Sequence, residues 1–89
     1  DDMLHYQLPD EAHIASLLKS RLARKAVKGV SWKRLAKHAL GLSYAEITRA
    51  ADDALKVVLI EQRDHVAESD IRGMLEERQL ASSRLKGSN

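Results

Sequence analysis

The sequence predicts an all-α fold, a bundle of four helices joined by short connections. Thirteen Leu and twelve Ala dominate its apolar residues, whereas Phe is absent and Trp occurs only once. Leu and Ala favour closely packed helices over a sheet. Gly, Pro and Ser stand between the apolar segments, where they commonly end one helix and begin the next. With 89 residues, the chain provides one domain at most.

The first helix is expected to begin at Pro9 and to end near Ala26. Proline fits the first turn of a helix, and the acidic Asp10 and Glu11 are favourable near the positive end of the helix dipole. An apolar stripe at helical spacing follows, formed by Ile14, Leu17, Leu18 and Leu22. Residues 1–8 are predicted to be an extended lead-in, because the residue before a proline is biased away from helix.

A tight junction between two helices is the most informative feature of the chain. Gly41 can adopt the left-handed conformation that ends a helix without steric cost. Ser43 and Glu46 are three residues apart, as a reciprocal capping box requires, and Leu42 and Ile47 occupy the positions of a hydrophobic staple. The helix that begins here directs free backbone N–H groups outward, and such groups favour phosphates or other anions.

The helices on both sides of this junction have apolar faces. Ser31 is expected to cap the earlier helix, which ends at Gly41. The later helix is the longest of the four and ends near Glu61. Its stripe is rich in small residues, which let a neighbouring backbone come close, and consists of Ile47, Ala50, Ala51, Ala54, Leu55 and Val58.

The last third of the chain is predicted to add one more helix. Residues 62–69 are expected to form a turn or a brief extended piece. A helix then begins near Asp70, and its inward-facing residues are Ile71, Met74 and Leu75. Residues 81–89 have the composition of a linker and are predicted to be a flexible tail, so the helical domain spans 9–80.

Charge is distributed unevenly along the chain, although the net charge is only +2. No acidic residue lies between Glu11 and Glu46. The basic residues in this interval are Lys19, Arg21, Arg24, Lys25, Lys28, Lys33, Arg34 and Lys37. Such a basic segment, 19–37, attracts phosphate, nucleic acid or an acidic protein surface, or simply forms a solvated helix face.

The sequence contains no set of residues that indicates catalysis or a metal site. A phosphate loop of the G-x-x-x-x-G-K-[ST] type is absent. The four histidines do not occur at H-x-x-x-H spacing, and the adjacent pairs Asp52-Asp53 and Glu76-Glu77 diverge on a helix. Without Cys, a membrane-spanning apolar run or a visible signal peptide, the chain is expected to be a soluble cytoplasmic protein with no membrane partner.

The motifs follow one another in a characteristic order from about Leu8 to Leu80. They are Leu8-Pro9-Asp10, Val30-Ser31-Trp32, Gly41-Leu42-Ser43-Tyr44-Ala45-Glu46, the alanine-rich run 47–55, and Val66-Ala67-Glu68-Ser69-Asp70-Ile71. In this order and at these separations they resemble the C-terminal helical lid domain of AAA-family (AAA+) ATPases. The resemblance implies a four-helix AAA+ lid-type bundle, with a short extended piece before the last helix.

The resemblance also implies that this domain is one part of a longer protein whose two parts have different roles. An N-terminal ATPase core would carry the phosphate loop, the magnesium-binding acids and the chemistry of hydrolysis. The lid would cover bound ATP or ADP and move the neighbouring subunits of a ring oligomer as the nucleotide changes. The chain by itself would then hold no cofactor and hydrolyse nothing.

Four residues are implied by the resemblance to border the nucleotide. Leu17 and Arg21 belong to the first helix, and Tyr44 and Ala45 to the start of the third. Tyr44 stands where the family usually has glycine, so it either stacks on adenine or narrows the pocket. Arg21 stands where histidine is frequent and is expected to reach ribose or phosphate. Arg49 lies one turn beyond the position of the arginine sensor of broader AAA+ relatives and is a weak substitute for it.

Each of these residues also has a plain structural interpretation. Leu17 fits a core position, Tyr44 a surface aromatic, and Arg21 a solvated basic side chain. Two other functions use the same pattern. The spacing around Gly41 fits a helix-turn-helix DNA-binding domain, although Glu46 and the acidic pair that follows would face the phosphates of the groove. A helical protein-interaction module needs no nucleotide at all.

Overall fold

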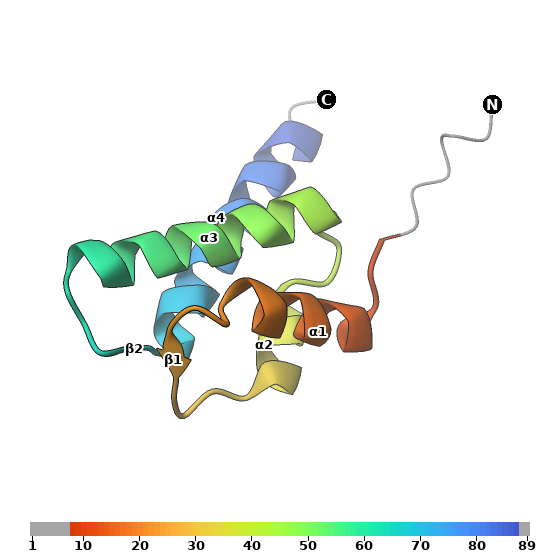
Figure 1. The fold of residues 1–89 in the computed structure, drawn as a ribbon. Helices are drawn as coiled ribbons and strands as arrows, with labels where there is room; N and C mark the ends of the chain where they lie inside the picture. The colour runs from red at the N-terminus through yellow and green to blue at the C-terminus, as the bar shows by residue number, and fades with distance from the viewer. Residues whose placement is uncertain (1–7, 88–89) are drawn as a thin grey trace.

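The computed structural model describes residues 8–87, which form four helices and a two-stranded parallel sheet (Figure 1). The predicted helical class is confirmed. In chain order the elements are α1 (Glu11–Arg21), β1 (Ala26–Val27), α2 (Trp32–His38), α3 (Tyr44–Ile60), β2 (His65–Val66) and α4 (Glu68–Gly87). Of the lead-in expected at 1–8, residues 1–7 lie outside the described part of the chain.

Helix α3 is the element against which the others pack. It contacts α1, α4 and β2, and Figure 1 shows it crossing in front of α4 with α1 below it. Its entire predicted apolar stripe is buried, and three of the buried positions are Ala50, Ala51 and Ala54. The remaining core is formed by Ile14, Leu18, Leu22, Leu35, Ala36, Ala39, Leu42, Val66, Ile71 and Leu75.

The first helix is shorter than predicted, because the chain turns at residues 22–25 and enters a strand at Ala26. Helix α1 ends at Arg21 instead of near Ala26. Ala26 and Val27 pair in parallel with His65 and Val66, and Lys28 N–H extends the ladder to the Val66 carbonyl at 3.3 Å. Alanine favours helix locally, but pairing with a strand 39 residues away overrides that preference. The extended piece predicted within 62–69 is confirmed as β2.

The parallel strands place the starts of α2 and α4 side by side, and one carboxylate links the two helices. Glu68 accepts a hydrogen bond from the backbone N–H of Ser31 at 3.0 Å and two from the Arg34 guanidinium at 2.6 and 3.1 Å. The Arg34 hydrogen bond, followed by that of Ser31, lowers the pKa of Glu68 to about 2. The charged side chain of an exposed arginine therefore fixes one end of α2 to α4.

Helix α4 begins and ends at other places than the sequence suggested. It starts at Glu68, two residues before Asp70, whose carboxylate accepts a hydrogen bond from Ala67 N–H at 2.8 Å. This bond is one half of a capping box, and the other half is absent because the alanine side chain has no acceptor for the Asp70 N–H. At its other end α4 continues as helix to Gly87, where a flexible tail over 81–89 had been expected. Residues 88–89 lie outside the described chain.

Helix α4 also fixes the other end of α2. The side-chain amide of Gln79 donates hydrogen bonds to the carbonyls of His38 and Leu40, at 2.9 and 2.8 Å. These carbonyls belong to the last turn of a helix and to the loop after it, where backbone acceptors lack helical partners. The seven-residue α2 is thus held at both ends by α4.

Helix α3 ends in a left-handed residue that is not glycine. Gln62 has φ +58°, the Arg63 N–H donates to the Val58 carbonyl at 3.0 Å, and the Gln62 N–H donates to the Leu59 carbonyl at 3.1 Å. These two bonds form a Schellman motif, whose left-handed position glycine usually occupies.

Gln62→Gly should therefore raise the free energy of unfolding by roughly 1 kcal/mol, because glycine adopts this conformation without the steric penalty of a side chain. Urea unfolding followed by circular dichroism measures the change. Glu61→Gly is the matched control, since Glu61 has φ −79° and glycine gains nothing there. A loss of stability in Gln62→Gly would contradict this description of the helix end.

The Glu68 carboxylate should make stability depend on acid pH. Its pKa in the folded chain is about 2, below the ordinary 4.5, so its contribution is fully present above pH 4.5 and is lost as the pH falls towards 2. The urea midpoints of the protein and of Glu68→Gln should differ at neutral pH and converge in this interval. Glu77→Gln, at an exposed site of the same helix, should show no such convergence. An offset for Glu68→Gln that is constant with pH would refute the linkage.

Candidate functional site

The junction before α3 is built as the sequence predicted. Gly41 has φ +93°, and Leu42 and Ile47 are fully buried on either side of the cap. The Ser43 hydroxyl accepts a hydrogen bond from Glu46 N–H at 3.2 Å, and the Glu46 carboxylate accepts one from Ser43 N–H at 3.1 Å. The capping box and the staple are therefore confirmed. Together they fix the direction in which α3 leaves the turn.

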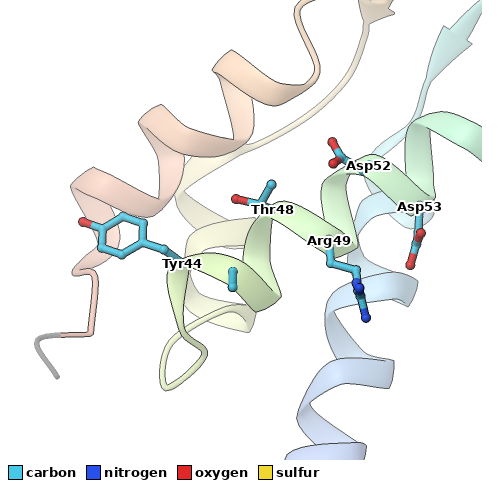
Figure 2. A pocket seen from close by; sticks show the side chains of 6 residues that line it. Tyr44, Thr48, Arg49, Asp52 and Asp53 are labelled. Atoms are coloured by element: carbon cyan, nitrogen blue, oxygen red, sulfur yellow. The ribbon is translucent and has the colours of Figure 1, made fainter. Parts of the chain in front are cut away.

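A shallow, open groove of about 570 Å³ lies on the exposed side of α3 beside this corner, and every described residue that lines it belongs to this one helix (Figure 2). The residues that line it form two rows with helical i, i+4 spacing. They are Tyr44, Thr48 and Asp52 in one row, and Ala45, Arg49 and Asp53 in the other. Tyr44 is 46% exposed at one end of the groove, and the two aspartates lie at the other end.

A bidentate ion pair joins α1 to the first of these rows. The Arg21 guanidinium donates to the Asp52 carboxylate at 3.0 and 2.8 Å from Nη2 and at 3.2 Å from Nε. Hydrogen bonding to Asp52, together with its charge, raises the pKa of Arg21. Both side chains are close to half exposed, so the pair is solvated and positions the arginine more than it stabilises the fold.

The four residues expected at a nucleotide site are only partly brought together. Tyr44 and Ala45 line the groove side by side at the start of α3. Leu17 is half-buried and packs against the core, as its structural interpretation predicted. Arg21 borders a second cavity, and its guanidinium is engaged by Asp52, so it does not reach into the groove beside Tyr44.

Sequence reasoning missed Asp52 as a residue of this site. It follows Tyr44 by eight positions, or about two helical turns, and therefore lies on the same side of α3. The i, i+8 spacing from Tyr44 is the sequence signal that places Asp52 on this side of the helix. The partner of Asp52 could not be inferred, because 31 residues separate it from Arg21.

The groove suits binding better than catalysis. It combines an exposed aromatic ring, one guanidinium and two carboxylates on a single rigid helix. Within residues 8–87, no three His, Cys, Asp or Glu side chains are close enough together to hold a metal ion. In the same part of the chain, every helix is too short or too polar to cross a bilayer.

Comparison with known proteins adds no assignment. A scan against protein-family models finds none that matches this chain, and a search of curated proteins finds no significant relative. The function must therefore be argued from the residues themselves.

Ser43→Ala should lower the free energy of unfolding by about 1 kcal/mol, because Glu46 N–H loses its acceptor at the start of α3. Ser43→Asp is the control, since its carboxylate can accept the same bond and also favours the positive helix end. Urea unfolding of both variants measures the difference. Equal stabilities for the two variants would show that the capping box does not hold this corner.

Proposed function

We propose that this chain is the C-terminal lid domain of an AAA-type ATPase, covering bound ATP or ADP and coupling hydrolysis to subunit movement. The observation that carries the proposal is the exposed Tyr44–Ala45 corner, held by a complete capping box at the head of the α3 groove. The helical order, the glycine turn and the short strand before α4 support the same assignment.

In this proposal, the Tyr44 ring provides one face of the adenine site. Tyr44 is 46% exposed at the start of α3, so part of its ring is accessible for stacking with a purine. The phosphates, the magnesium ion and the residues of hydrolysis belong to an N-terminal ATPase core. Arg21 has a positioning role in this proposal, because its guanidinium is held by Asp52 and so joins α1 to α3. Leu17 packs against the core and supports α1.

The packing of the bundle supports a lid that moves as one body. A single apolar cluster joins α1, α2, α3 and α4, and α2 is bonded to α4 at both ends. A change of the bound nucleotide that displaces the start of α3 would therefore rotate the whole domain relative to the ATPase core. This rotation would move the neighbouring subunits of a ring.

The helix-turn-helix alternative fits this geometry less well. Helix α3 lies against both α1 and α4, and its exposed groove carries Asp52 and Asp53, which a phosphate-lined DNA groove repels. One observation does favour DNA binding, namely that the exposed lysines of the basic segment form no ion pair with the described carboxylates. They are Lys19, Lys28, Lys33 and Lys37. Salt-sensitive, sequence-selective retention on duplex DNA would support that alternative.

Tyr44→Glu should weaken ATP binding by the complete gene product about tenfold, because stacking on an aromatic ring is lost and a charged carboxylate takes the place of the ring in the adenine site. Glutamate in a first helical turn keeps α3 intact. Ile60→Glu is the matched control, since it introduces the same charge at an exposed apolar site near the other end of α3. Displacement of a fluorescent ATP analogue measures both affinities.

Two results would contradict the lid assignment. The first is an unchanged ATP affinity in Tyr44→Glu, which would favour the protein-interaction module. The second is a coding sequence without a phosphate-loop segment upstream of Asp1, because no ATPase core would then exist for this domain to cover.

A further inference from the structure

A second groove, of about 330 Å³, lies near the C-terminal end of α3; it includes the Arg21–Asp52 ion pair described above but neither Tyr44 nor Ala45. Three apolar residues line it, Leu55, Leu59 and Ile60. Leu55 is buried, whereas Leu59 is 51% and Ile60 72% exposed, although both are among the most hydrophobic residues of the chain. Adjacent exposed aliphatic side chains around a concave surface are typical of a protein interaction site.

The rim of this groove is positively charged. Arg21 and Asp52 neutralise one another across it. Arg24 and Lys56 also line the groove, are exposed, and pair with no carboxylate among the described side chains. The three apolar residues are therefore bordered by two available cations, whose long side chains can cover an apolar ligand while their charges face solvent.

We propose that this basic-rimmed groove, lined by Arg24, Leu55, Lys56, Leu59 and Ile60, binds a short amphipathic helix of a partner protein that carries carboxylates beside its apolar residues. Burial of Leu59 and Ile60 provides the affinity, and the two cations select an acidic partner. A nucleic acid would satisfy the cations but leave the two aliphatic side chains without apolar contacts, so a protein helix fits both features.

The test is an NMR titration of isotopically labelled protein with two designed helical probe peptides. The first has leucines at i, i+4 spacing flanked by glutamates, and the second has lysine in place of every glutamate. The first peptide should shift the amide signals of residues 55–60 and of Arg24, and the second should not. Lys56→Glu should abolish this preference, because among the described groove residues Arg24 is then the only unpaired cation and shares the groove with a new carboxylate. Ile60→Glu should weaken binding of the first peptide about tenfold.

Both variant positions are exposed, and the unchanged signals of the core verify that each variant folds. The proposal would be overturned by equal binding of both peptides, by absence of binding, or by amide-signal shifts confined to residues 28–37. Concentration-dependent shifts at the groove without any peptide would overturn it in favour of a second copy of this chain. Because neither Tyr44 nor Ala45 is changed, failure here leaves the nucleotide proposal standing.

Discussion

The close packing of α3 against its neighbours is the constraint on which the rest of the fold depends. Ala50, Ala51 and Ala54 are fully buried in the middle of this helix, between α1 and α4. Their small side chains let both neighbours approach, and a larger residue at any of them would overpack the core. Because one side of α3 is occupied in this way, its exposed side carries the first groove, and the second groove lies where α3 meets the end of α1 and the turn that follows it.

Direct packing on α1 and α4 sets the orientation of α3, and the short helix α2 additionally fixes the place at which α3 begins. Seven residues form a marginal helix in isolation, so α2 depends on its neighbours. Glu68 binds its first turn and Gln79 binds the carbonyls at its end, and both come from α4. Because α2 is held in this way, the turn at residues 39–43 places Tyr44 at a fixed position. The exposed tyrosine is thus positioned by α4, a helix that does not line its groove.

Local signals allowed much of this to be predicted from sequence. The capping box at Ser43, the left-handed Gly41 and the stripe of α3 depend on residues a few positions apart, and all three are present in the structure. The features that were missed depend on distant partners. A two-residue strand at Ala26–Val27 has no periodicity to detect, and Asp52 is distinguished from its neighbour Asp53 only by its contact with Arg21. The nucleotide role of Tyr44 comes from the resemblance and remains a proposal.

In the proposed lid, the corner at Tyr44 and Ala45 faces the purine of the bound nucleotide. Photolabelling of the complete gene product with an azido-adenine analogue of ATP tests this most directly, because trypsin should release residues 38–49 as one peptide containing both positions. We expect the label in that peptide and its loss when unlabelled ATP competes. Labelling that is confined to other peptides, or that persists in the presence of excess ATP, would contradict the claim.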